Sequence, residues 1–248
     1  MKTIPLALSL LTITLLLASC DLRRRNEPPT ISRVACRFCQ QQQIVENGVI
    51  INGIRWATRN VDMPGTFTKN PEDAGMFYQW NHCLGWSNTE PFINSDGNSD
   101  WGCWVSGWEY FDDTFIWSRA TDPCPPGWRV PTAGEFYSLL LTTIGVSVAD
   151  WDCEDFLDFW YNYDFSSHWT NNWQSTGVSG MILGRSPNQI FLPAVGSSDC
   201  YLLKGNYWSS SGRNLSVAAR LTFQEESAFV WDRSPTDSAI SVRCVAEN

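Results

Sequence analysis

The chain has 248 residues, with 17 Lys or Arg against 26 Asp or Glu, so its formal net charge is −9. An acidic chain binds phosphate backbones poorly, which argues against nucleic acid as a partner. A hydrophobic content of 43% excludes a disordered chain, and only 2 His residues leave few groups for acid–base or metal chemistry. The unusual features of the composition are 14 Trp and 9 Cys.

Residues 1–20 have the pattern of an export signal, in which Lys2 precedes an apolar run. This run is shorter than the roughly 20 residues that span a membrane. It ends at Leu17-Ala18-Ser19-Cys20, which resembles a bacterial lipobox, where the leader is cut before the Cys and the thiol is acylated. We therefore predict a signal peptide over 1–19 and lipidation of Cys20, with a plain secretory leader or a membrane anchor as alternatives.

The polar, proline-containing segment 20–40 predicts a lipid-anchored tether, followed by one domain over 41–248. The even number of cysteines after Cys20 is typical of disulfides in an exported protein. The Cys36-x-x-Cys39 spacing also fits a redox pair or half of a zinc site, but no βαβ pattern or second close pair accompanies it. The spacing leaves the pairing open for Cys36, Cys39, Cys83, Cys103, Cys153 and Cys200.

The first predicted element of the domain is a β-hairpin over 44–61. Two short apolar runs there flank Asn52-Gly53, the pair typical of a two-residue hairpin turn. The helical spacing of Met76, Phe77 and Trp80 then predicts a helix over 72–80. Residues 82–123 follow neither period, so we expect long irregular loops there.

The clearest helix signal begins at Thr132. Its spacing to Glu135 is that of a capping box, and Phe136, Leu139 and Leu140 supply an apolar stripe as far as Thr143. Helical spacing with an acidic outer face predicts a second helix over 150–165. Strand patterns follow over 189–195, 207–210, 218–223, 228–231 and 240–246.

Several short motifs occur in order over about residues 48–246: Ile54–Val61, Gly75–Trp80, Cys124–Thr132, Phe191–Ala194, Tyr207–Ser211 and Ser241–Val245. Together they resemble the Fibrobacter succinogenes major paralogous domain of Bacteroidetes lipoproteins. The resemblance implies an α+β fold class: a single C-type lectin-like domain with two main helices packed on twisted, mostly antiparallel sheets and long irregular loops. It also implies location at the outer membrane, on either face, and a disulfide between Cys124 and Cys244.

The resemblance brings no settled activity or cofactor. The calcium-dependent sugar site of some C-type lectins is not carried over, because Phe92 and Arg233 stand where that site needs ligands. Oxygen ligands do alternate along a short loop, as they do in calcium sites, at Asp96, Asn98 and Asp100. Since Trp101 and Gly107 replace the Gly and Glu of an EF-hand, the alternative is a turn rich in Asn and Asp. We predict no cofactor, with calcium as the weaker alternative.

Catalytic patterns are weak. His82 and His168 are isolated in the sequence, and no Gly-x-Ser-x-Gly turn is present. The acidic residues of 150–165 fit the solvated face of a helix better than a glycosidase pair. We therefore predict that the protein is not an enzyme.

The tryptophans carry the functional hypothesis, because Trp rings stack on sugars and anchor protein interfaces. Packing is the alternative, and we assign it to Trp56, Trp80, Trp128 and Trp208. Loop tryptophans among Gly, Asn and Ser predict a ligand-binding surface, with Trp101 and Trp104 as anchors, that comprises Trp86, Trp101, Trp104 and Trp108. The predicted function is a lipid-anchored, extracytoplasmic binding or adhesion domain for a glycan or protein ligand. The alternatives are an accessory subunit of an outer-membrane envelope complex and an extracytoplasmic enzyme.

Overall fold

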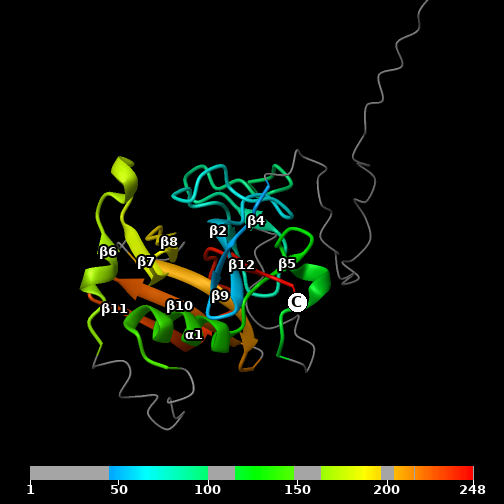
Figure 1. The fold of residues 1–248 in the computed structure, drawn as a ribbon. Helices are drawn as coiled ribbons and strands as arrows, with labels where there is room; N and C mark the ends of the chain where they lie inside the picture. The colour runs from blue at the N-terminus through cyan, green and yellow to red at the C-terminus, as the bar shows by residue number, and fades with distance from the viewer. Residues whose placement is uncertain (1–44, 100–114, 148–162, 197–203, 215, 248) are drawn as a thin grey trace, which may run out of the picture. The chain divides into compact units, whose positions relative to one another are not determined.

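The computed structural model describes residues 45–99, 115–147, 163–196, 204–214 and 216–247 (Figure 1). These residues are mostly β and contain one α-helix, α1 (Ala133–Ile144), with several antiparallel sheets. The predicted α+β, C-type lectin-like fold class with two main helices on the sheets is therefore wrong. Most of the predicted second helix lies outside the described residues, and 163–165 at its end are not helical.

The first sheet joins both ends of the domain, in the strand order β1-β2-β12-β5. Its strands are β1 (Val49–Ile51), β2 (Ile54–Asn60), β12 (Arg243–Ala246) and β5 (Trp128–Arg129). The hairpin predicted around Asn52-Gly53 is confirmed: both turn residues have positive φ, at 48° and 79°, and Ile51 pairs with Ile54. Such backbone angles favour Asn and Gly, so the turn pair sets the register of the hairpin.

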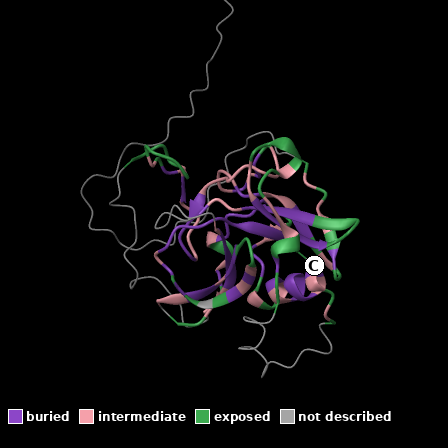
Figure 2. Ribbon diagram, turned by 90° about the vertical axis from the view of Figure 1, so that its left-hand side faces the viewer, coloured by how far each residue is buried: buried purple, intermediate pink, exposed green. Residues whose placement is uncertain are grey.

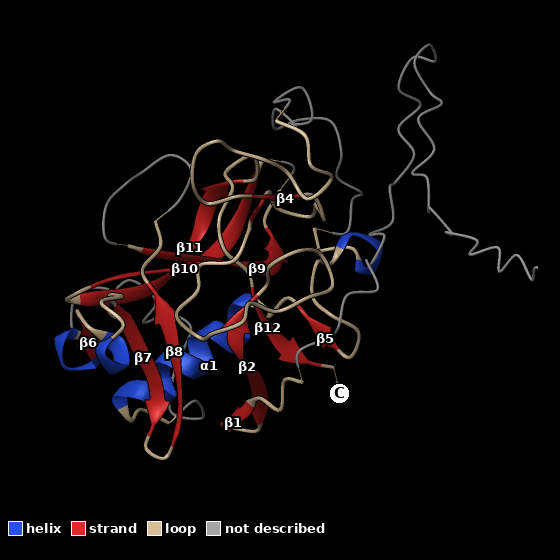
Figure 3. Ribbon diagram, turned by 90° about the horizontal axis from the view of Figure 1, so that it is seen from above, coloured by secondary structure: helices blue, strands red, loops and turns tan. Residues whose placement is uncertain are grey.

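Two three-stranded sheets follow along the chain (Figure 3). One has the order β6-β7-β8, from β6 (Trp169–Thr170), β7 (Gly180–Arg185) and β8 (Asn188–Pro193). The other has the order β11-β10-β9, from β9 (Gly205–Gly212), β10 (Val217–Gln224) and β11 (Ser227–Pro235). The late strand predictions are confirmed in outline, whereas β7 was not predicted.

The helix predicted over 72–80 is wrong, because the chain there turns and then forms β3 (Phe77–Tyr78), which pairs with β4 (Gly85–Trp86). Gly75 has a φ of 70°, and a Cβ at this position would lie 2.1 Å from the Val61 carbonyl oxygen. The Tyr78 N–H donates to the Ile240 carbonyl at 2.8 Å, a bond that a helix would not allow. Pairing with a remote segment therefore overrides the local helical spacing.

The helix α1 begins and ends as its sequence predicts. The Thr132 side chain accepts from the Glu135 N–H while Glu135 accepts from the Thr132 N–H, and Gly145 ends the helix with a φ of 81°. Phe136, Leu139 and Leu140 are buried and join the core with side chains of β7, β10 and β11. Most of the strand ribbon is buried and the turns are exposed (Figure 2).

A buried polar cluster connects the sheets at Arg243. Its guanidinium donates to Asn60 Oδ1 at 3.0 Å, the Ala57 carbonyl at 3.1 Å and the Phe191 carbonyl at 3.2 Å. Complete burial lowers the pKa of Arg243 to about 10. This arginine therefore joins β2, β8 and β12 through polar contacts inside the core.

Candidate functional site

The loop tryptophans predicted to bind ligand do not form a site among the described residues. Trp86 is 2% exposed and pairs with Phe77 between β3 and β4. A ring buried to this extent offers no face to a ligand, so the interpretation is corrected for this residue. Trp101, Trp104 and Trp108 lie outside the described residues.

The calcium candidate has the geometry of the alternative interpretation, a turn closed by its own Asn side chain. Asn94 Oδ1 accepts from the Asp96 N–H and the Asn98 N–H, both at 3.0 Å. Asp100 lies outside the described residues. Within the part of the chain that the structure describes, no group of three or more His, Cys, Asp or Glu side chains is placed to hold a metal ion.

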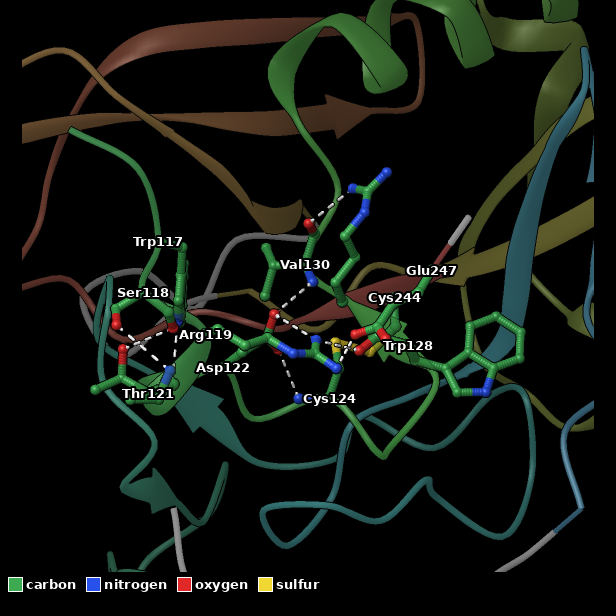
Figure 4. A network of polar contacts seen from close by, with 12 residues as sticks. Trp117, Ser118, Arg119, Thr121, Asp122, Cys124, Trp128, Val130, Cys244 and Glu247 are labelled. Carbon is green, nitrogen blue, oxygen red and sulfur yellow. Dashed lines mark hydrogen bonds and ion pairs between the residues drawn. A yellow bond between two sulfur atoms is a disulfide. The ribbon is translucent and has the colours of Figure 1, made fainter. Parts of the chain in front are cut away.

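The sulfurs of Cys124 and Cys244 lie at disulfide distance, 2.09 Å, and the pair links residues 120 apart in sequence (Figure 4). These are the two cysteines that the family resemblance paired. Beside them, Asp122 accepts from the Cys124 N–H at 2.9 Å and from the Val130 N–H at 3.1 Å. The carboxylate thus holds both ends of the turn that leads from the disulfide to β5.

The neighbouring residues of Asp122 also form hydrogen bonds and ion pairs with one another. Arg119 donates to the Trp128 carbonyl at 2.8 Å and forms an ion pair with Glu247. Burial raises the pKa of Asp122 to about 6, against the opposing effects of its two N–H donors and of Arg119. Since the carboxylate is 7% exposed and bonded to backbone on both oxygens, we assign this network to structure.

An open cleft lies where β6 meets the turn between β10 and β11. It is lined by Trp169, Asn171, Gln224, Glu225 and Glu226. Trp169 is partly buried against the main core, while the other four side chains are exposed. The cleft thus combines one aromatic ring with amide and carboxylate groups.

Two backbone features position the cleft. Phe165, which is 1% exposed, fixes the segment before β6 in the core, and its N–H donates to the Glu226 carbonyl at 3.1 Å. Trp169 then pairs with Met181 of β7, which sets its ring on the core side of that sheet. The Trp169 segment and the Glu225-Glu226 turn, remote in sequence, are therefore held side by side.

Side-chain hydrogen bonds orient the amide of the cleft. Trp169 Nε1 donates to Asn171 Oδ1 at 2.8 Å, so the Asn171 NH₂ group is left as the donor end of that amide. Burial lowers the pKa of the neighbouring His168, and Arg185 lowers it further, so this imidazole is neutral at pH 7. Hence His168 supplies no positive charge to balance the carboxylates of Glu225 and Glu226.

A second tryptophan of the same segment lies on the opposite face of the β6-β7-β8 sheet. Trp173 stacks on Phe191 with ring centroids 4.5 Å apart and an interplanar angle of 2°. Phe191 pairs with Ile182, whereas Trp169 pairs with Met181, and neighbouring strand residues point to opposite faces. Trp173 is therefore not part of the cleft.

The cleft was not predicted from the sequence, although its segment shows the same pattern of tryptophans among small polar residues. Residues 166–179 hold two tryptophans among Ser, Asn, Thr and Gly, the same composition that directed attention to 86–108. Glu225 and Glu226 carried a second signal, because Glu-Glu is an unusual pair for a hairpin turn.

No family model, curated protein or solved structure matches this chain. The family resemblance therefore stays a prediction. Among the described residues no helix is both long and apolar enough to cross a membrane.

Proposed function

We propose that the protein is a lipid-anchored, extracytoplasmic binding domain that recognises a glycan in the cleft at Trp169. The observation that carries this proposal is a partly exposed indole beside exposed amide and carboxylate groups. A pyranose ring presents an apolar face and a rim of hydroxyl groups. The indole can stack on the apolar face, and the side chains of Asn171, Glu225 and Glu226 can form hydrogen bonds with the hydroxyl groups.

The cleft is suited to binding by a rigid framework. The Trp169 ring packs on the main core and its Nε1 is bonded to Asn171, so little side-chain freedom is lost when a ligand arrives. The Phe165–Glu226 backbone bond likewise fixes the turn that carries the carboxylates.

A protein partner is the second candidate, favoured by the outer strand β11. Trp231 on this strand is 42% exposed and lies edge-on to Phe229, with ring centroids 6.5 Å apart. Exposed aromatic rings of this kind anchor protein interfaces. This surface fits the accessory-subunit alternative.

The glycan proposal is tested on a glycan microarray with a soluble chain that begins at residue 33 and so omits Cys20, since residues 33–248 form one compact unit. We expect Trp169→Ala and Asn171→Ala each to abolish the binding that the wild-type chain shows, measured per folded molecule. Trp231→Ala is the matched control, since it removes an exposed indole outside the cleft lining, and it should bind as the wild type does. Loss of binding with Trp231→Ala alone would move recognition to β11.

The anchor is tested separately by intact-mass analysis of the protein extracted from membranes. We expect an acylated Cys20 as the first residue. A mature chain that begins elsewhere, or wild-type protein in the soluble fraction, would contradict the lipoprotein assignment without affecting the cleft.

A further inference from the structure

We propose that the cleft selects sugars by charge, accepting neutral and amine-bearing glycans and rejecting acid-bearing ones, through Glu225 and Glu226. This inference rests on the proposed glycan function and names its ligand class. It is carried by the placement of two adjacent carboxylates beside Trp169.

The two glutamates are not explained by the turn that they form. Gln224 pairs with Ser227, so Glu225-Glu226 alone connect β10 to β11. Asn and Gly are favoured where a two-residue hairpin turn needs positive φ, as at Asn52-Gly53. Neither Glu225 nor Glu226 has a positive φ, so this turn accepts most residue types and its backbone does not require Glu at either position.

The two carboxylates have no ion-pair partner among the described residues, and no Lys or Arg lines the cleft. The nearby His168 is neutral at pH 7, because burial lowers its pKa. Both carboxylates are exposed, so water solvates them in the free protein and a donor group of a ligand can replace that water.

The available groups define the ligand chemistry. A carboxylate only accepts hydrogen bonds, so two of them call for hydroxyl or ammonium donors. Asn171 supplies the complementary donor, since its oxygen is bonded to Trp169 Nε1. A sugar carboxylate in this cleft would face two like charges, a juxtaposition that suppresses binding.

The test uses three hexasaccharides with the same β-1,4 backbone, built from glucose, glucosamine or glucuronic acid. Calorimetry on the soluble chain should show the glucose and glucosamine forms binding, with the glucosamine form at least about tenfold tighter than the glucuronic acid form. The double variant Glu225→Gln with Glu226→Gln should remove this preference. Amide groups keep the size of the side chains, and exposed turn residues contribute little to folding, so the variant is expected to fold.

The control is Glu90→Gln with Asp96→Asn, which removes the same two charges from exposed residues outside the cleft. It should keep the preference, because long-range fields are screened by salt. Equal loss in both variants would assign selectivity to net charge and overturn the inference.

The remaining outcomes separate the inference from the function on which it rests. If all three hexasaccharides bind equally and Trp169→Ala abolishes their binding, the charge selection is wrong and the glycan function stands. If no hexasaccharide binds and the microarray shows no glycan ligand, both are overturned.

Discussion

The network around Asp122 and the cleft around Trp169 both contain carboxylates at a turn, but their hydrogen-bonding capacity is used differently. Asp122 is 7% exposed and accepts from two backbone N–H groups. Glu225 and Glu226 are exposed and form no ion pair within the described residues. A polar group whose hydrogen bonds are all made within its own chain stabilises the fold, whereas an exposed group without such bonds is available to a ligand.

The difference predicts where substitutions affect stability and where they affect binding. The largest effect is expected at the disulfide beside Asp122. Replacing both Cys124 and Cys244 with Ala should lower the free energy of unfolding by roughly 4–5 kcal/mol, because the bond closes a loop of 120 residues. Denaturant unfolding measures the loss. Non-reducing peptide mapping that links Cys124 to another cysteine would reject the pairing.

A slightly smaller loss is expected at Arg243. The substitution Arg243→Met removes the buried donors to Asn60 Oδ1 and to two core carbonyls, at a cost of about 3–5 kcal/mol. Arg55→Met is the matched control in the same sheet, since Arg55 is exposed and makes one hydrogen bond to a carbonyl. A similar loss in both variants would show that the buried hydrogen bonds are not the cause.

The pH dependence of Asp122 is the next prediction. Its pKa of about 6 in the fold lies above the ordinary aspartate value of 3.8, so protonation favours the folded state. The stabilising contribution is fully present below pH 3.8 and is lost as the pH rises through about 6. Relative to Asp122→Asn, the wild type should gain roughly 2–2.5 kcal/mol between pH 7 and pH 4.

Chemical unfolding of both proteins at these pH values provides the measurement, and groups common to both cancel in the difference. Because Asn offers one acceptor to two N–H donors, the variant is expected to be less stable throughout. If the stability difference between the wild type and Asp122→Asn shrinks as the pH falls, the two N–H donors and Arg119 outweigh burial in setting the pKa of Asp122.

Local signals predicted the parts of the fold that depend on neighbouring residues. The turn at Asn52-Gly53 and the capping box of Thr132 and Glu135 act within a few residues, and both were found. The 72–80 segment was misassigned, because its conformation depends on the bond from Tyr78 to Ile240. Helical spacing over nine residues carries no information about such a remote partner.

The site was less predictable for the same reason. Composition identified loops that carry tryptophans but could not distinguish the buried Trp86 from the partly exposed Trp169. The cleft also needs Glu226, which only the backbone bond to Phe165 brings beside the Trp169 segment. The Glu-Glu pair of this turn was visible in the sequence, but its proximity to the Trp169 segment was not.

The smallest effect on stability is expected at that turn, and it tests the comparison most directly. Replacing Glu225→Asn together with Glu226→Gly gives the turn the pair used at residues 52–53. We expect the free energy of unfolding to change by no more than about 1 kcal/mol, because both residues are exposed and neither has a positive φ. The glucosamine hexasaccharide should lose its tighter binding over the glucuronic acid form, since both carboxylates are gone. Denaturant unfolding and calorimetry on the same samples measure the two effects. If the variant unfolds more easily and keeps this preference, the glutamates stabilise the fold and do not select the ligand, and the contrast with Asp122 fails at this turn.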